Sequence, residues 1–289
     1  MEQIINQYHL TQIKDRKVSY RKIGNGSRKI LFFHGFPGSS IQIELFSPLI
    51  HVLDLEVLCF DRPGYNETEI SESESQYTQV SFIARALLHS FGWTKCEVVS
   101  VSGGTPFLFS FLKTSAELVS KVTVMSGLGP LAQKEFMDMM SLKTKIGLKV
   151  ILAIPGTILK RTILFGLKNR NSNKFNLVRF FMPVANADLK VLQQKKVQLT
   201  FSQALQEAFL QNGAGPKRDA KSFMENWPLV QENIKCAVSF WHGDSDQIVP
   251  YEMAQLMSQM VSGSSLHIIS NEGHYSLSIG KISEILSFK

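Results

Sequence analysis

Runs of apolar residues typical of buried strands alternate with runs that have apolar residues at helical spacing, and this alternation restricts the fold more than any other feature of the chain. Alternation of this kind implies a mostly parallel sheet with helices on both faces. We therefore expect an α/β fold with eight strands, the first two antiparallel. The predicted strands are 8–13, 18–23, 29–33, 57–60, 97–101, 119–125, 237–241 and 266–269, and the predicted helices between them are 41–53, 80–91, 251–260 and 277–288.

The alternation stops after 119–125 and resumes at 237–241. The residues between are helical in character, leaving after one strand and returning before the next. They are predicted to form a helical cap at 128–232, inserted between core residues 1–127 and 233–289. Open α/β folds bind ligands at the carboxyl edge of the sheet, so a cap there would cover the ligand site.

Basic residues are concentrated in this insertion. Between Lys134 and Lys196 there are thirteen Lys and Arg but three acids, a local net charge of +10 in a chain whose net charge is +7. This unevenness points to an anionic substrate or a membrane surface rather than to nucleic acid. A solvated basic face is the simplest interpretation, and weak membrane contact through the cap stays open beside it.

The most apolar stretch, 146–167, has the length of a membrane span. Lys149, Lys160 and Arg161 lie inside it, however, and Pro155-Gly156 divides it in two. Two short amphipathic helices are therefore expected. Their apolar faces could line a substrate tunnel, pack as cap core or touch lipid.

Composition places the chain among globular proteins, with 44% hydrophobic and 19% charged residues. An acid, Glu2, stands where a signal peptide would be basic, so we expect a cytoplasmic protein. The three cysteines, Cys59, Cys96 and Cys236, are widely spaced and form no C-x-x-C pair. Neither a disulfide framework nor a metal site is expected.

The segment Ser100-Val101-Ser102-Gly103-Gly104 joins a predicted strand to a helical run. A nucleophilic serine on a sharp strand-to-helix turn needs small residues two positions before and after it, because strand and helix almost touch. Those positions hold Ser100 and Gly104. Ser102 is therefore the predicted nucleophile, although Ser100 replaces the glycine of the usual G-x-S-x-G pattern.

A serine nucleophile needs a base and an orienting acid. His274 follows the last predicted strand and would project from the same sheet edge as Ser102, so it is the predicted base. The loop 242–250 offers two carboxylates, of which Asp246 is the predicted acid and Asp244 a turn residue. The other histidines are expected to be structural or surface residues.

An oxyanion hole needs two N–H donors. One is the backbone N–H of the residue after the nucleophile, Gly103. The loop His34-Gly35-Phe36-Pro37-Gly38 follows the third strand, and Pro37 cannot donate, so the Phe36 N–H is the predicted second donor.

Together these segments resemble the α/β-hydrolase superfamily of the Ser-Asp-His type, over the whole chain apart from the cap. The elbow and Trp241-His242-Gly243 also look like a bacterial subgroup of uncharacterised hydrolases, as does the cap end at 213–227. The matching segments are His34 to Gly38, Asp61-Arg62-Pro63-Gly64-Tyr65, the elbow at Ser102, His242 to Pro250, and Gly273-His274.

The resemblance implies a serine hydrolase that cleaves a carboxylic ester or related small acyl compound through an acyl-enzyme, carboxylesterase-like and without metal or organic cofactor. Thioester, C–C bond, lipase-like and cofactor-free peroxidase activities use the same triad and stay open. Epoxide hydrolases and haloalkane dehalogenases of the family place an aspartate where this chain has Ser102. A ligand-binding or signalling protein with little turnover is the alternative, and the oligomeric state is not determined by the sequence.

Overall fold

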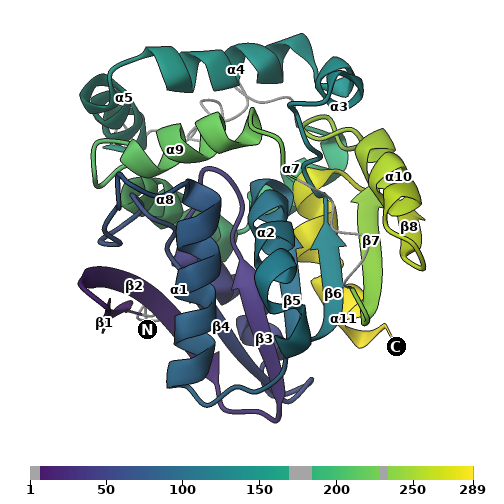
Figure 1. Cartoon of the computed structure of the whole chain (residues 1–289). Helices are drawn as coiled ribbons and strands as arrows, with labels where there is room; N and C mark the ends of the chain where they lie inside the picture. The colour runs from purple at the N-terminus through teal and green to yellow at the C-terminus, as the bar shows by residue number, and fades with distance from the viewer. Residues whose placement is uncertain (1–6, 169–183, 228–233, 289) are drawn as a thin grey trace.

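The computed structural model describes residues 7–168, 184–227 and 234–288. In this part of the chain eight strands form one sheet in the order β1-β2-β4-β3-β5-β6-β7-β8 (Figure 1). β1 pairs antiparallel with β2, and β2 with β4, while all later pairs are parallel. The strands are β1 (His9–Ile13), β2 (Arg16–Gly24), β3 (Arg28–Phe33), β4 (Leu55–Phe60), β5 (Cys96–Val101), β6 (Val119–Met125), β7 (Ala237–Gly243) and β8 (Ser265–Ile269).

Helices cover both faces of this sheet because its central strands are apolar on both sides. Successive residues of β3 show this, since Leu31 and Phe33 pack on one face while Ile30 and Phe32 pack on the other. The first face is covered by α1 (Gln76–Ser90), α2 (Thr105–Ser115) and α10 (Tyr251–Met260), and the second by η1 (Ser40–Leu49) and α11 (Ile282–Ser287). The predicted fold class is confirmed.

Two predicted helices differ from the structure. The segment expected as a helix at 41–53 is a 3-10 helix, η1, which contains Pro48 and ends at Leu49. Proline has no N–H to donate, so the hydrogen bonds of this segment are interrupted at Pro48 and the helix ends one residue later. The helix expected at 277–288 is divided into a π turn, η4 (Ser276–Gly280), and α11.

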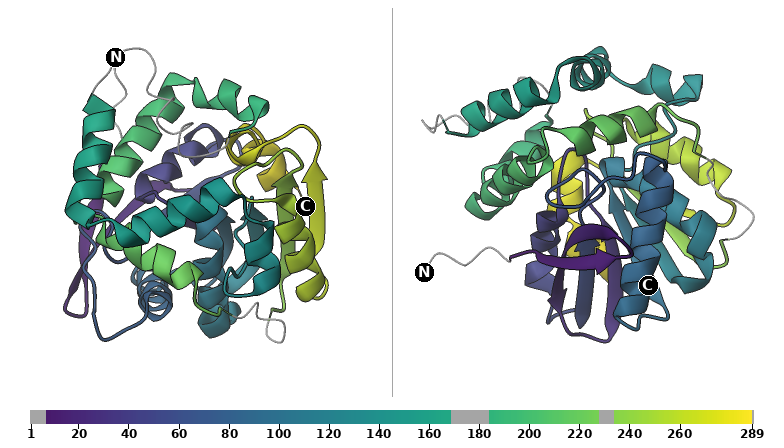
Figure 2. Two further views of the ribbon diagram at one scale, coloured as in Figure 1. Left: turned by 90° about the horizontal axis from the view of Figure 1, so that it is seen from above. Right: turned by 60° about the vertical axis from the view of Figure 1, so that its left-hand side comes forward.

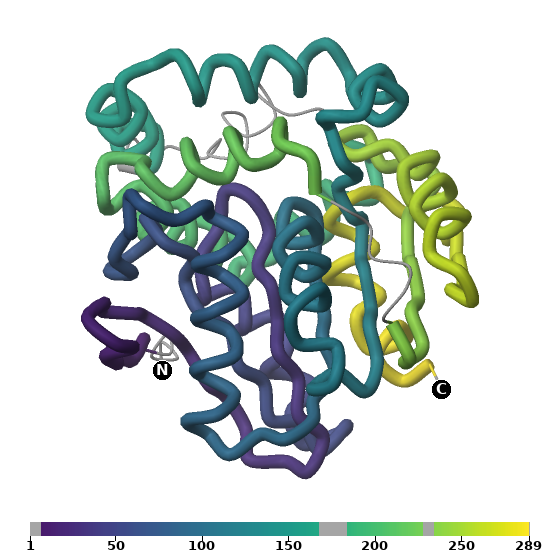
Figure 3. Tube along the Cα trace, viewed as in Figure 1, coloured from purple at the N-terminus to yellow at the C-terminus, as the bar shows by residue number. Residues whose placement is uncertain are grey.

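Between β6 and β7 the described residues form helices and no strand. These are α3 (Lys134–Met139), α4 (Leu142–Ala153), α5 (Gly156–Lys168), α7 (Asn186–Leu192), α8 (Lys195–Ala208) and α9 (Ala214–Phe223). The tube in Figure 3 follows the chain as it leaves β6, crosses above the sheet and returns in β7. We call residues 128–232 the inserted segment; its predicted end at 232 lies outside the described residues.

The inserted segment is layered. α4 and α5 lie farthest from the sheet, and α9 lies between α4 and the core helix α1, which it also contacts (Figures 1 and 2). α8 packs against η1, which covers the second face of the sheet. The break between α4 and α5 falls at Pro155, as the sequence predicts. Within the described residues, no helix combines the length and apolarity needed to cross a bilayer.

Candidate active site

Ser102 occupies a sharp turn between β5 and α2. It is the first residue of a short 3-10 turn, η2 (Ser102–Gly104), and its φ is +52°. A serine in this left-handed region is strained, and such strain of about 1 to 3 kcal/mol is characteristic of functional sites. The residue is 9% exposed. The turn lifts Ser102 out of the strand at the carboxyl edge of the sheet.

The close approach of strand and helix explains the small residues around Ser102. A Cβ on Gly104 would lie 2.4 Å from the Phe33 carbonyl oxygen, so glycine is required there. Ser100 is fully buried, and its Oγ lies 3.2 Å from Oγ1 of Thr105 at the start of α2. The serine that replaces the usual glycine is therefore accommodated by a hydrogen bond across the turn.

Asp246 and His274 are in direct contact, with His274 Nδ1 2.7 Å from Asp246 Oδ2. They come from the loops after β7 and β8, which are neighbours in the sheet. The other carboxylate oxygen, Oδ1, accepts the backbone N–H groups of Ile248 at 2.9 Å and Val249 at 3.0 Å. These bonds fix the carboxylate toward the imidazole.

In the Asp246–His274 pair, each residue stabilises the charged form of the other. Burial alone would raise the pKa of Asp246, but His274 and His242 outweigh it and hold that pKa well below its ordinary value. Burial also opposes the charged form of His274, yet the Asp246 carboxylate outweighs it and raises the pKa of His274 above 6.5. Asp246 is thus ionised at neutral pH and stabilises the imidazolium.

His242 is a second histidine on the same carboxylate, which the sequence analysis left among the structural histidines. Its Nε2 lies 2.9 Å from the Val249 carbonyl oxygen and 3.2 Å from Asp246 Oδ2. Since a carbonyl can only accept, Nε2 carries a proton. The spacing of four residues between His242 and Asp246 was the available signal.

The loop after β6 forms hydrogen bonds to the backbones of both Ser102 and His274. The Leu128 N–H donates to the Ser102 carbonyl oxygen at 3.2 Å, and the Ser126 hydroxyl donates to the His274 carbonyl oxygen at 3.5 Å. Among the described residues there is no hydrogen bond between the Ser102 and His274 side chains. The structure therefore joins Asp246 to His274 and brings Ser102 to the same edge without a direct bond.

The two predicted oxyanion donors lie next to each other. A Cβ on Gly103 would lie 2.6 Å from Cβ of Phe36, so the elbow and the loop after β3 are in contact. Within the described part of the chain, the Phe36 N–H donates to no other group. It is thus available to an oxyanion.

The orientation of the Phe36 N–H is set by its own peptide group. The Gly35 carbonyl is the opposite end of that planar unit. Its oxygen accepts from Arg62 Nη2 at 3.2 Å and lies 3.0 Å from His34 Nδ1. Arg62 Nη1 also donates to the His34 carbonyl oxygen at 2.7 Å. Arg62 thereby fixes the two carbonyl groups of this loop, and the Gly35 carbonyl points away from the Phe36 N–H.

A carboxylate of the inserted segment holds Arg62 in turn. Asp219 on α9 is fully buried and lies 2.7 Å from the guanidinium, and it also accepts from the Tyr65 hydroxyl at 2.6 Å. On the next turn of α9, the Phe223 ring packs edge-on against Phe36 with centroids 5.0 Å apart. Residues 213–227, whose role the sequence analysis left open, thus contact and support the loop that carries Phe36.

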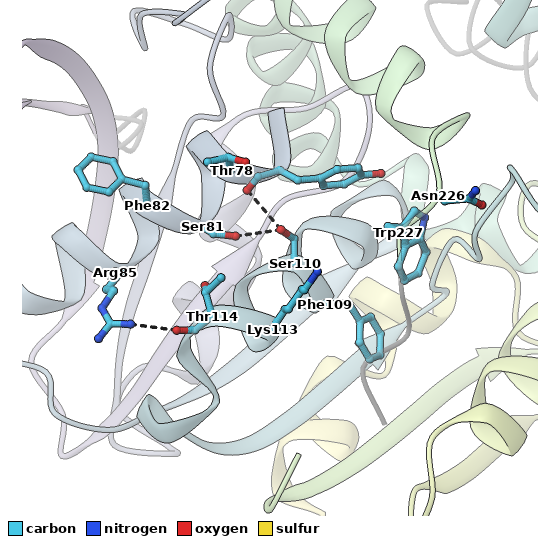
Figure 4. Close-up of a pocket in the computed structure, with 11 residues that line it drawn as sticks. Thr78, Ser81, Phe82, Arg85, Phe109, Ser110, Lys113, Thr114, Asn226 and Trp227 are labelled. Carbon is cyan, nitrogen blue, oxygen red and sulfur yellow. Dashed lines mark hydrogen bonds between the residues drawn. The ribbon is translucent and has the colours of Figure 1, made fainter. Parts of the chain in front are cut away.

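A surface hollow of about 480 Å³ lies away from this site, between α1, α2 and the residues after α9 (Figure 4). Two pairs of its polar groups are bonded to each other, Ser81 with Ser110 at 3.0 Å and Arg85 with the Thr114 carbonyl at 2.9 Å. None of the predicted site residues lines it. Within the described residues, including this hollow and the candidate site, no cluster of three or more His, Cys, Asp or Glu could hold a metal ion.

Comparison with known proteins gives a consistent result. Residues 29–280 match the family described as alpha/beta hydrolase fold. Similar structures include a bromoperoxidase from Bacillus anthracis, with a TM-score of 0.71 and 16% identity, covering 98% of this chain and 100% of that one. An esterase from Exiguobacterium antarcticum has a TM-score of 0.66 and 15% identity, covering 98% of this chain and 97% of that one. No curated protein sequence is a significant match.

Proposed function

Because the chain belongs to the alpha/beta hydrolase fold family, we propose that it is a serine hydrolase that cleaves a carboxylic ester or a related acyl compound. Ser102 is the nucleophile, His274 the general base and Asp246 the orienting acid. The observation that carries the proposal is the buried contact of 2.7 Å between His274 and Asp246, at the same sheet edge as the strained Ser102.

The geometry supports a two-step reaction. His274 takes the proton of the Ser102 hydroxyl as the Ser102 oxygen attacks the carbonyl carbon, and the N–H groups of Phe36 and Gly103 donate hydrogen bonds to the oxyanion. The tetrahedral intermediate collapses as the leaving alkoxide takes the proton from His274. His274 then takes a proton from water as the water oxygen attacks the acyl carbon. The bond to the Ser102 oxygen breaks, this oxygen takes the proton back from His274, and the carboxylic acid leaves. An oxyanion donor typically contributes about 10²- to 10³-fold to such a step.

A fluorophosphonate probe tests this proposal, because it phosphonylates activated serines. We expect labelling of Ser102 in the folded protein, loss of labelling in Ser102→Ala, and strong reduction in His274→Ala. Ser120→Ala removes an exposed serine on β6 and should label like the wild type. A folded protein that is not labelled would contradict catalysis and favour the ligand-binding alternative.

The bond cleaved is tested separately. A panel of p-nitrophenyl esters of rising acyl length, with matching thioesters, should show turnover that disappears in Ser102→Ala. Bromoperoxidase and meta-cleavage product hydrolase are names carried by similar structures, so perhydrolysis and C–C cleavage belong in the same panel. Turnover of the esters alone supports the proposal, and turnover confined to another bond type would replace its substrate class.

A second candidate function is hydrolysis of a substrate presented at an anionic membrane. The exposed side chains of α4 and α5 favour it. Leu142 is 73% exposed and Phe165 69%, and Ile146 and Ile158 are half exposed between them. Lys and Arg are interspersed along these helices, and no acid occurs between Asp138 and Asp188. Apolar side chains with a basic surround suit an anionic lipid surface, where each basic residue contributes about 1 kcal/mol.

Vesicle sedimentation tests this second candidate. We expect binding to vesicles of phosphatidylcholine and phosphatidylglycerol in equal amounts, weak binding to phosphatidylcholine alone, and release at high salt. Phe165→Ser should weaken binding, whereas Val52→Ser, an equally exposed apolar residue outside the inserted segment, should not. Equal binding to both vesicles, or to neither, would overturn it and leave hydrolysis of soluble esters unaffected.

A further inference from the structure

A second buried carboxylate lies beneath His274, and it comes from the inserted segment. Asp188 on α7 is 1% exposed. Its Oδ1 accepts the backbone N–H groups of Tyr275 and Ser276, both at 2.8 Å, and its Oδ2 accepts the N–H of His274 at 3.2 Å. Three successive amides of the histidine loop thus converge on one side chain that lies 86 positions or more earlier in the chain.

These amides lie at the start of the helical turn at His274, and the first backbone N–H groups of such a turn have no partner within it. Asp188 satisfies them as a capping residue would, but from another part of the chain. The contact is close enough to dictate the neighbouring residue. A Cβ on Gly273 would lie 2.5 Å from both Asp188 carboxylate oxygens, so only glycine fits there.

The charge of Asp188 faces the histidine without an ion-pair partner among the described residues. The charged and titratable groups around His274 are Asp246 on its Nδ1, His242 beyond that carboxylate, Tyr275 beside the ring and Asp188 beneath its backbone. Asp246 and Asp188 both raise the pKa of His274, against the opposite effect of burial. Two carboxylates therefore favour the imidazolium.

We propose that Asp188 is a positioning residue for His274, which holds the backbone of the histidine loop so that the imidazole faces Asp246 and Ser102, and whose charge favours the imidazolium formed in each step. This inference rests on the proposed function for its catalytic part. It gives the inserted segment a role in assembling the site as well as in covering it.

The substitution Asp188→Asn tests both the positioning of His274 and the effect of the Asp188 charge. The asparagine can keep the two hydrogen bonds to Oδ1, but it loses the charge and replaces the acceptor for the His274 N–H. We expect kcat to fall on the order of tenfold, since small displacements of a catalytic group are costly. The acid limb of kcat/KM should move to lower pH. Asp138→Asn, an exposed acid on α3, is the matched control and should change neither.

Nuclear magnetic resonance titration of His274 in the Ser102→Ala background gives a readout independent of turnover. The titration of His274 should shift to lower pH on adding Asp188→Asn, and circular dichroism should show a folded protein. An unchanged titration, or a fall in kcat with an unmoved acid limb, would overturn the inference and leave Asp188 with a purely structural role. Absence of labelling in the wild type would instead count against the proposed function.

Discussion

The imidazole of His274 lies 2.7 Å from the carboxylate of Asp246, and the two residues are held there by separate sets of backbone bonds. Asp246 is oriented by the amides of Ile248 and Val249. His274 is held through the amides that Asp188 accepts. The contact therefore depends on the loops that follow β7 and β8 and on the inserted segment.

The pH dependence of kcat/KM should report His274. A base works only when neutral, so activity falls as pH decreases through its pKa, and Asp246 raises that pKa. The acid limb is therefore expected above pH 6.5. In Asp246→Asn it should move to lower pH, with a rate loss of about 10³- to 10⁴-fold. Asp244→Asn changes an exposed acid of the same loop and should retain activity; the reverse result would exchange the two roles.

Ser100→Gly restores the usual elbow glycine but removes the hydrogen bond to Thr105. We expect activity close to wild type and a free energy of unfolding lower by about 1 kcal/mol. Urea denaturation and ester hydrolysis measure the two effects. A large loss of activity with unchanged stability would show that the Ser100 hydroxyl takes part in catalysis.

Gly104→Ala and Gly147→Ala should have opposite effects. The new Cβ at 104 would overlap the Phe33 carbonyl oxygen, and the resulting backbone shift should cost about 3 kcal/mol or prevent folding. At 147, inside α4, nothing lies within 4 Å, and alanine should stabilise the helix by about 1 kcal/mol. Thermal unfolding of both variants checks this, and similar melting temperatures would contradict the packing at the elbow.

Asp219→Ala should destabilise the protein strongly because it leaves the buried Arg62 without its carboxylate. Breaking a buried ion pair from one side typically costs about 3 to 5 kcal/mol. Urea denaturation should show this loss, whereas Asp138→Ala, an exposed acid, should leave the unfolding midpoint unchanged. Residual folded Asp219→Ala protein should have lower kcat, since Arg62 holds the carbonyl behind the Phe36 donor. Wild-type stability in this variant would show that the pair does not brace the loop.

Gly273→Ala tests the contact with Asp188 by a double-mutant cycle. The single variant should lose about 2 kcal/mol, because its Cβ would overlap the Asp188 carboxylate. The same change in an Asp188→Ala background should cost clearly less, since the space is then open. Denaturation of the four proteins gives the coupling free energy. Additive losses would mean that the two residues do not contact each other in solution.

Much of the fold could be predicted because its signals are local. Strand runs that are apolar on both sides predicted the parallel sheet, and β5, β6 and β7 begin within a residue of the predicted positions. The helix at 41–53 was wrong in extent because Pro48 interrupts its hydrogen bonds, and the structure ends it at Leu49 as a 3-10 helix. The C-terminal helix was wrong in length because one periodic pattern ran through two elements.

The candidate site could be predicted only in part. Ser102, Asp246 and His274 lie in short patterns with their own signals, and their catalytic roles stay a prediction. Asp219 and Asp188 carry no such signal. Each is an ordinary acid in a helical segment, and each acquires its role from a partner 157 or 86 positions away.

The sequence by itself determined the sheet, the elbow and the order of the candidate triad, because apolar periodicity and small residues at a turn act over neighbouring positions. Only the tertiary structure decided what holds these groups in place. Burial removes water from Arg62, Asp219 and Asp188, so each must find its partners within the fold, and those partners are the loops that carry Phe36 and His274. The inserted segment, which the sequence offered as a cover, also supplies the carboxylates that brace the site.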